Sequence, residues 1–122
     1  MVTVSPTAIG FAFGDVLLVP FPFTDQQGVT QRPAVVVSSA AYNANRPNVL
    51  IMSITSVLRS PRSALAFAEA MLVDWQGAGL IKPSVFKPVL TTIEQRLVIK
   101  RLGSVSANDA ALLRTVLARV IG

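Results

Sequence analysis

Residues 14–39 read GDVLLVPFPFTDQQGVTQRPAVVVSS, two apolar runs that flank a polar loop. The runs Val16–Val19 and Ala34–Val37 are short and rich in β-branched residues, and turn formers or charges bound them, so both predict strands. Two prolines stand at the entrance of the loop, and Arg32 closes it as the first basic residue of the chain. Because Pro33 pushes Arg32 towards an extended conformation, we expect the guanidinium near the mouth of the sheet.

Four more apolar runs indicate further strands: Val49–Met52, Ala66–Val73, Val85–Thr92 and Leu97–Ile99. Pro88 interrupts the third of these runs. Because proline cannot donate to a strand ladder, that strand should bend, bulge or lie at an edge there. Residues 38–48, SSAAYNANRPN, are too rich in Asn and Pro for a good helix, so this connection does not resemble a parallel crossover. The sheet should therefore be mostly antiparallel.

One helix is predicted, over residues 106–121. Ser106 and Asp109 form a capping-box pattern with Asp in the acidic position. Apolar residues then recur at helical spacing: Ala110, Leu113, Leu117 and Val120. Residues 74–80, DWQGAGL, are expected to form a short turn or a single helical turn.

These elements predict a mainly β (α+β) fold, a small antiparallel β-barrel with a C-terminal helix. We expect one domain over residues 1–122, with residues 1–12 as an N-terminal extension. Several strands are apolar at successive positions, so both of their faces need cover. Barrel closure covers one face, and one helix cannot cover all of the other. A symmetric homodimer is therefore the economical hypothesis for the remainder.

Composition narrows the classes of protein. Hydrophobic residues make up 52% of the chain and charged residues 14%, against roughly 25% charged residues in an average soluble domain. No apolar run reaches the roughly 18 residues of a membrane span, and the N-terminus lacks the basic region of a signal peptide. We therefore expect no membrane association and a cytoplasmic location. Cysteine and histidine are absent, which argues against disulfides and a structural zinc site.

Charge is unevenly distributed along the chain. Residues 82–122 hold seven basic and two acidic residues, which accounts for the whole net charge of +5. Such a bias favours an anionic partner, such as nucleic acid or an acidic peptide. A merely soluble basic surface explains the charge equally well.

Most familiar catalytic sites are excluded. The chain has no His for a triad and no Cys nucleophile, and its six carboxylates are too widely spaced for a local metal cluster. We predict neither a metal nor a cofactor. What remains is Arg32 and a set of hydroxyls. Ser53 and Thr55 alternate around Ile54, so both point to one face of a strand, and Ser56 follows. The alternative interpretation is a surface arginine beside hydroxyls that satisfy local backbone groups.

Together these features resemble the MazF/PemK family of toxins from bacterial toxin–antitoxin pairs. Residues 14–39 are similar to its N-terminal signature: a Gly-Asp opening strand, a glycine-containing loop, and Arg-Pro before a hydrophobic strand. Residues 49–59, VLIMSITSVLR, resemble the next strand of the family, which ends in Ile-Thr-Ser or a close variant. Residues 74–106 resemble the later half of the PemK-like branch, so the resemblance covers roughly residues 13–106.

The resemblance implies an SH3-like barrel that works as a homodimer. It implies a ribosome-independent, sequence-selective endoribonuclease that cuts single-stranded RNA without a metal ion. It also implies neutralisation by an antitoxin whose acidic, flexible tail occupies the RNA groove. The catalytic arginine of the family falls on Arg32, and its catalytic threonine falls on Thr55.

A mechanism follows as a hypothesis. The ribose 2′-hydroxyl attacks the adjacent phosphorus and expels the 5′-oxygen, which leaves a 2′,3′-cyclic phosphate and a 5′-hydroxyl end. Arg32 would neutralise the phosphorane oxygens. Thr55, with Ser53 or Ser56 beside it, would donate a hydrogen bond to the same oxygens.

The remaining candidate residues are a general base and a set of side chains that would contact the RNA. Arginine is a poor base and the chain has no His, so Asp25 in the loop is the candidate base, ahead of Asp15 and Glu94, which are interpreted first as structural groups at strand ends. The candidate substrate-binding residues are Phe23, Thr24, Gln31, Lys82 and Lys87, together with Ser53 and Ser56. The loop amides Gln26 and Gln27 could also contact bases.

Two alternatives keep the fold and change the function. In the first, a catalytically weakened relative serves as an RNA-binding or protein-binding module. In the second, a toxin on the same fold blocks a protein target such as DNA gyrase through its dimer surface.

Overall fold

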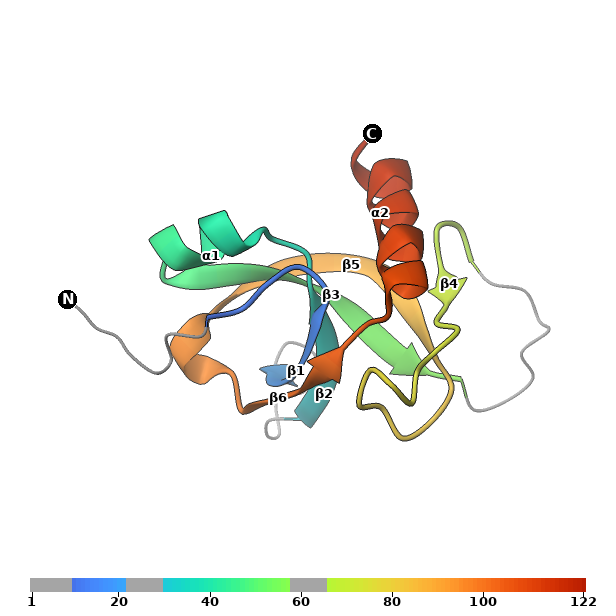
Figure 1. Ribbon diagram of the computed structural model, residues 1–122, viewed down its shortest axis with the longest axis horizontal. Helices are drawn as coiled ribbons and strands as arrows, with labels where there is room; N and C mark the ends of the chain where they lie inside the picture. The colour runs from blue at the N-terminus through green and yellow to red at the C-terminus, as the bar shows by residue number, and fades with distance from the viewer. Residues whose placement is uncertain (1–9, 22–29, 58–65) are drawn as a thin grey trace.

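The computed structural model of the protein describes residues 10–21, 30–57 and 66–122. These residues form a six-stranded sheet in which all paired strands are antiparallel, in the order β4-β5-β3-β2-β1-β6. The strands are β1 (Asp15–Phe21), β2 (Thr30–Val36), β3 (Asn48–Ser56), β4 (Ala70–Met71), β5 (Ser84–Glu94) and β6 (Lys100–Ser104). The helices are α1 (Ala40–Asn45) and α2 (Ala107–Ile121), and a 3-10 turn, η2 (Gln95–Leu97), precedes β6. Figure 1 shows α2 and α1 at different ends of the sheet.

The prediction of a mainly β fold with a C-terminal helix is confirmed, although the word barrel describes the sheet only loosely. β4 and β6 are its edge strands and do not pair with each other in the described part of the chain, so the sheet remains open. β4 comprises only Ala70 and Met71. Such a short edge strand offers few free backbone groups to another chain.

The central strands are buried on both faces, as their continuous apolar runs predict. On one face, side chains of β1, β2 and β3 pack with Leu113 and Val116 of α2. These strand residues are Val16, Val35, Met52 and Ile54. The opposite face has its own core group: Leu17, Val19, Ala34, Val36, Val49 and Ile51. Cover on that face comes partly from Ile93 and Val98, at the far end of the sheet.

The irregularity predicted at Pro88 is a bulge. Met52 pairs with Leu90 and Ile54 pairs with Phe86, so residues 87–89 of β5 stand opposite the single residue Ser53 of β3. A bulge bends the strand and sharpens its twist. The bulge lies opposite Ser53 of β3, two residues before Thr55.

Two predicted strands are wrong in extent. The run Ala66–Val73 forms a strand only at Ala70–Met71, because residues 66–69 make a turn closed by the Glu69 N–H donating to the Ala66 carbonyl. The run Leu97–Ile99 does not form a strand. The Val98 N–H donates to the Gln95 carbonyl and closes the η2 turn, and β6 begins only at Lys100.

Residues 38–48 contain a helix that the composition argued against. The Ser39 hydroxyl accepts the Tyr42 N–H and so caps α1. The buried Asn43 amide donates to the Phe11 carbonyl at 2.9 Å. Asn-rich sequence is poor in helix propensity, but these capping and tertiary hydrogen bonds stabilise six helical residues. The antiparallel pairing of β2 with β3 is as predicted.

The capping box at the start of α2 is only half formed. The Ser106 hydroxyl accepts the Asp109 N–H at 3.1 Å, as predicted. The Asp109 carboxylate does not return to Ser106. It is fully buried and accepts the N–H groups of Val73 and Asp74, each at 2.8 Å. Asp109 therefore ties α2 to the segment that leads into β5. None of the described helices has the length and apolar character to span a membrane.

Candidate functional site

A cleft of about 390 Å³ opens where β2 begins and β3 ends. β2 contributes Gln31, Arg32 and Pro33, and β3 contributes Ile54, Thr55 and Ser56. A third segment, residues 80–84, completes the lining with Leu80, Ile81, Lys82 and Ser84. We call residues 80–84 the third wall. The cleft thus joins three segments that are far apart in the sequence.

The two central residues of the site, Arg32 and Thr55, line the cleft just beyond the paired part of β2 and β3. Ala34 pairs with Ser53, and the pairing of β2 with β3 ends there. Arg32 and Thr55 each lie two residues beyond this last pair on their strands, and both residues line the cleft. The two strands separate beyond Ser53, and the cleft lies in that opening.

Arg32 presents an uncommitted charge to the cleft. It lies within β2, where its backbone pairs with Val19 of β1, in agreement with the extended conformation expected before Pro33. Its side chain is exposed. Within the described ranges, the ion pairs involve other residues and none includes Arg32. Among the described residues, no ion pair therefore occupies the guanidinium donors that an anion would use.

The hydroxyl residues divide between the cleft and the sheet. Ile54 is 1% exposed and points into the core, and Ser53 and Thr55 are partly exposed on either side of it. Thr55 and Ser56 line the cleft, whereas Ser53 lies one step inside the paired region and does not. The structure thus separates Ser53 from the other two hydroxyls.

Only one of the two candidate lysines lines the cleft. Lys82 lies on the third wall and is exposed. Lys87 does not line the cleft, and its ammonium lies 3.4 Å from the Glu69 carboxylate. Gln31 lines the cleft as predicted. The remaining loop candidates, Phe23, Thr24 and Asp25 with Gln26 and Gln27, lie outside the described residues, so their assignments stay predictions.

Two carboxylates have structural partners, as the sequence interpretation had it. Asp15, which is 6% exposed, accepts the Ala12 N–H and the Ser104 hydroxyl, and it lies 3.6 Å from the Arg101 guanidinium. Glu94 pairs with Arg96. No carboxylate lines the cleft among the described residues, and this part of the chain holds no group of three Asp or Glu residues arranged for a metal ion.

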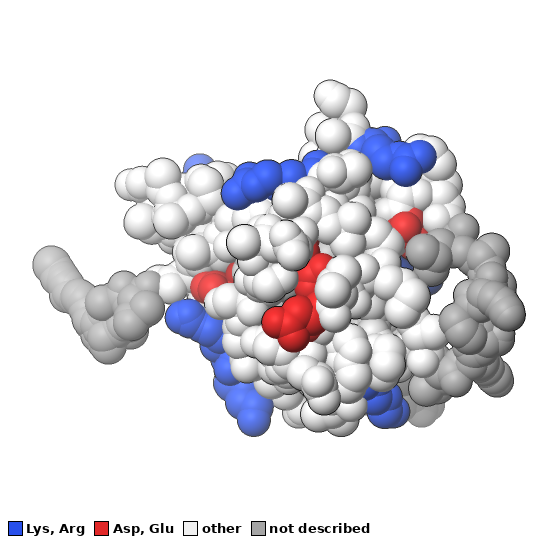
Figure 2. Space-filling model, turned by 45° about the vertical axis from the view of Figure 1, so that its right-hand side comes forward, with Lys and Arg blue, Asp and Glu red and all other residues white. Residues whose placement is uncertain are grey.

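Positive charge is spread over the molecule. On the face drawn in Figure 2, Lys and Arg side chains form separate groups instead of one continuous stripe. The net positive charge of the chain therefore does not by itself identify the cleft as a binding site. Arg32 and Lys82, on two of its three sides, supply the positive charge that lines it.

Sequence reasoning missed most of the third wall. Leu80, Ile81 and Ser84 line the cleft beside Lys82, but their stretch shows neither strand nor helix periodicity. Their one sequence signal was indirect, since the stretch lies within residues 74–106, which resemble the later half of the PemK-like branch. Pro33 also lines the cleft, although its predicted role was only to extend Arg32.

Comparison with protein families decides which family this is. A model for the PemK-like, MazF-like toxin of type II toxin–antitoxin systems matches residues 12–121. The chain belongs to this family. The resemblance stated on the motifs at residues 14–39 and 49–59 is thereby confirmed. A comparison with curated proteins gave no match.

Solved structures share the PemK/MazF fold. An endoribonuclease in complex with its cognate antitoxin, from a Mycobacterial species, is 16% identical to this chain, with a TM-score of 0.67 over 91% of this chain and 92% of the other. The Mycobacterium tuberculosis toxin MazF-mt6 is 18% identical, with a TM-score of 0.66 over 87% and 94%. MazF from Deinococcus radiodurans is 25% identical, with a TM-score of 0.66 over 91% and 94%.

Proposed function

We propose that this PemK/MazF family member is a sequence-selective endoribonuclease that cuts single-stranded RNA without a metal ion. The observation that carries the proposal is the cleft that Arg32 and Thr55 both line, with Arg32 exposed and free of ion pairs among the described residues. Family membership supports a toxin. Structural neighbours that are named endoribonucleases support RNA as the substrate.

Arg32 and Thr55 suit the charge that develops in RNA cleavage. A guanidinium offers a planar fork of donors that matches two phosphoryl oxygens. The Thr55 hydroxyl donates one more hydrogen bond to the same group. Donors held in place before the reaction stabilise the phosphorane more than the ground-state phosphodiester. Lys82 on the third wall would neutralise a neighbouring phosphate, and Ser56 adds a second hydroxyl near Thr55.

The proposed reaction is an internal transfer within the RNA. The ribose O2′ forms a bond to phosphorus as the bond from phosphorus to O5′ breaks, which gives a 2′,3′-cyclic phosphate and a 5′-hydroxyl. The 2′-hydroxyl proton passes to a general base, and O5′ gains a proton as it leaves. Asp25 is the proposed base, from the loop between β1 and β2.

Two protein partners belong to the proposal. The first is an antitoxin with an acidic tail, which would occupy the cleft and pair with Arg32 and Lys82. A structural neighbour in complex with its cognate antitoxin supports this partner. The second partner is another copy of the chain, because the surface exposes large apolar side chains, such as Phe67 at 70% and Ile121 at 71%. Association would remove such side chains from water.

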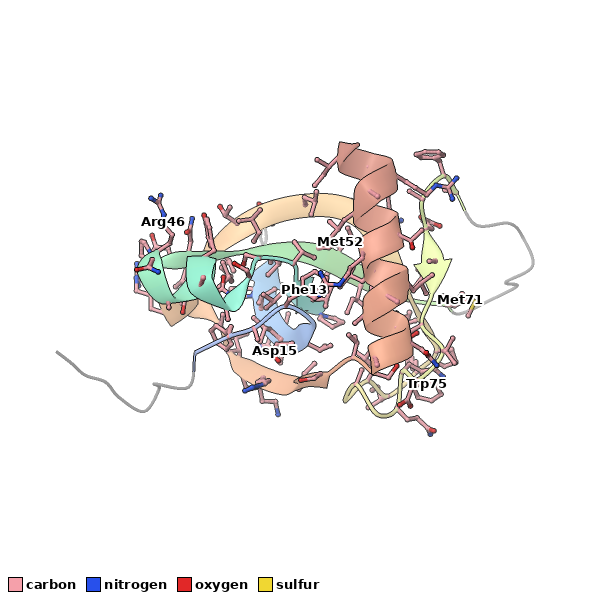
Figure 3. All side chains as sticks on the ribbon, turned by 45° about the horizontal axis from the view of Figure 1, so that its top comes forward. Phe13, Asp15, Arg46, Met52, Met71 and Trp75 are labelled. Carbon is pink, nitrogen blue, oxygen red and sulfur yellow. The ribbon has the colours of Figure 1, made fainter. Side chains whose placement is uncertain are left out.

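The test uses purified protein and RNA of mixed sequence in the presence of EDTA. We expect discrete cuts whose new ends carry a 5′-hydroxyl, detected by direct phosphorylation with polynucleotide kinase. Arg32→Ala should lower the cleavage rate by about 10²–10³-fold, the usual cost of removing one oxyanion-stabilising group. Arg46→Ala is the matched control, because Arg46 is an exposed arginine beside α1 (Figure 3).

Three outcomes contradict the proposal. Cleavage that EDTA abolishes would rule out the metal-independent mechanism. Intact RNA with retained RNA binding would indicate the binding module. Intact RNA without binding, together with inhibition of DNA gyrase, would indicate the target-blocking toxin.

A further inference from the structure

Ile81 is an exposed apolar side chain at the edge of the cleft. It lines the cleft and is 85% exposed. Leu80, directly before it, is 9% exposed and belongs to the core under α2, and Ser84, three residues after it, is 3% exposed, whereas Lys82 and Pro83 are exposed. The third wall is therefore anchored in the core on both sides of Ile81, while the Ile81 side chain remains in solvent.

Hydrogen bonds fix the backbone of the third wall. The Leu80 N–H donates to the Trp75 carbonyl at 3.0 Å. The Ser84 hydroxyl donates to the Lys82 carbonyl at 2.8 Å. Val57, which follows β3, donates its N–H to the Pro83 carbonyl at 2.9 Å. Within three residues of Ile81, the backbone is thus tied both to the preceding turn and to the strand that carries Thr55.

The segment behind the third wall is held by α2 and by β6. Asp109 of α2 accepts the N–H groups of Val73 and Asp74, and Figure 3 shows Trp75 close to the first turn of α2. Gly79 has a φ of +90°, and a Cβ there would lie 2.1 Å from the Leu102 carbonyl oxygen of β6. The backbones of this segment and β6 therefore touch directly, and Ile81 is presented from a rigid support.

The remaining lining of the cleft leaves few surfaces for a base. Single-stranded RNA is read with its bases splayed out and packed on flat or apolar side chains. Among the described residues that line the cleft, none is aromatic. Arg32 is assigned to the phosphate in the proposed function, and Pro33 is half-buried. Among the described residues that line the cleft, Ile81 is the apolar side chain most exposed to solvent.

We infer that Ile81 packs against the face of a nucleobase next to the scissile phosphate and determines which base is accepted there. The inference rests on the proposed function and adds a specificity-determining residue to it. Because hydrogen bonds already order the backbone of the third wall, little conformational freedom is lost when the base docks. The contact therefore contributes to selectivity at a small entropic cost.

The experiment compares an intact oligonucleotide with two base-free oligonucleotides for each variant. The first is an RNA oligonucleotide with one preferred cut site, chosen from the cuts that wild-type protein makes in mixed-sequence RNA. The second set keeps the ribose but lacks the base at one of the two nucleotides that flank the cut. Ile81→Ala should lower kcat/KM on the intact oligonucleotide by about tenfold, at the low end of what loss of a base-stacking side chain costs.

The missing base makes the test specific. On the oligonucleotide that lacks the contacted base, wild-type protein and Ile81→Ala should have equal kcat/KM. Removing the base and removing the side chain each eliminate the same contact, so the second removal has no further effect. Ile81→Ala should also broaden the cut pattern on mixed-sequence RNA, and Ile81→Leu should preserve it. Ile99→Ala, in an isoleucine that is 43% exposed and outside the cleft lining, is the matched control and should change neither quantity.

Two results would overturn the inference and leave the proposed function intact. One is an unchanged cut pattern with Ile81→Ala. The other is an equal fold-loss on the intact and both base-free oligonucleotides, which would indicate a general disturbance of the cleft. If wild-type protein leaves every oligonucleotide uncut, the proposed function fails and this inference fails with it.

Discussion

The two halves of β3 have different surroundings. Ile51 and Met52 pair with β2 on one side and with β5 on the other, and both are fully buried. Thr55 and Ser56 still pair with β5, but their pairing with β2 has ended, and both are partly exposed. One strand therefore supplies the core in its first half and the cleft in its second half.

The boundary between the halves lies at the bulge. Residues 87–89 of β5 stand opposite Ser53 alone, and Ser53 is also the last residue of β3 paired with β2. A bulge increases the local twist and often lies near functional sites. The candidate site therefore forms where β3 no longer pairs with β2. At Thr55, β3 still pairs with β5 on one side, and the cleft lies on the other side.

The largest effect is expected on stability, in the first half of β3, which pairs with a strand on each side. Ile51→Ala should lower the free energy of unfolding by about 4 kcal/mol, because it leaves a cavity in a fully buried core. Chemical denaturation measures the loss. Ile99→Ala, at a more exposed isoleucine, should cost less than about 1 kcal/mol. If cleavage by the remaining folded Ile51→Ala protein also falls, the two halves of β3 are not separable in function.

A slightly smaller effect is expected in the second half of β3, at Thr55, where the strand pairs with β5 and no longer with β2. This effect concerns the cleavage rate instead of stability. Thr55→Val keeps the shape and removes the hydroxyl, so it should cost about 3 kcal/mol of transition-state stabilisation, or roughly 10²-fold in rate. The unfolding free energy should change by less than about 1 kcal/mol. Thr55→Ser should retain most of the rate, and Thr91→Val, in an exposed threonine of β5, should leave it unchanged. Wild-type rates in Thr55→Val would remove Thr55 from the site.

The smallest of the three effects concerns the anchor of the third wall. Asp109→Asn replaces one acceptor oxygen by an amide, so one of the two N–H groups at Val73 and Asp74 loses its partner. This should lower the free energy of unfolding by about 2 kcal/mol, measured by thermal or chemical denaturation. Asp74→Asn, in an exposed carboxylate that accepts the Gly77 N–H, is the control, and it should lower the free energy of unfolding by less than about 1 kcal/mol. An equal loss in both variants would mean that burial of Asp109 is unimportant.

Elements governed by local rules were predictable from the sequence. The predicted helix over residues 106–121 matches α2, because Ser106 caps it and its apolar spacing is regular. The shared face of Ser53 and Thr55 followed from the two-residue period of a strand. α1 was missed because the hydrogen bond from Asn43 to Phe11 joins residues 32 positions apart. No local pattern contains that partner.

The candidate site was predictable where the motif residues lie on strands. Arg32 was placed at the end of the loop, directly before a strand, and Thr55 was placed on a strand; both line the cleft. Lys82 and Lys87 are indistinguishable in the sequence, and only tertiary structure sends one to the cleft and pairs the other with Glu69. Ile81 lies in a segment without periodicity. Its exposure is set by the buried residues around it and by a backbone contact with β6.

The two hydrogen bonds that Asp109 accepts from the N–H groups of Val73 and Asp74 can form only after α2 has been translated. α2 follows every other element of the fold in the chain, so it leaves the ribosome after both strands that carry Arg32 and Thr55. A nascent chain that has been translated only through β6 lacks the clamp behind residues 80–84. The support of the third wall is therefore complete only after the last helix of the fold has been synthesised.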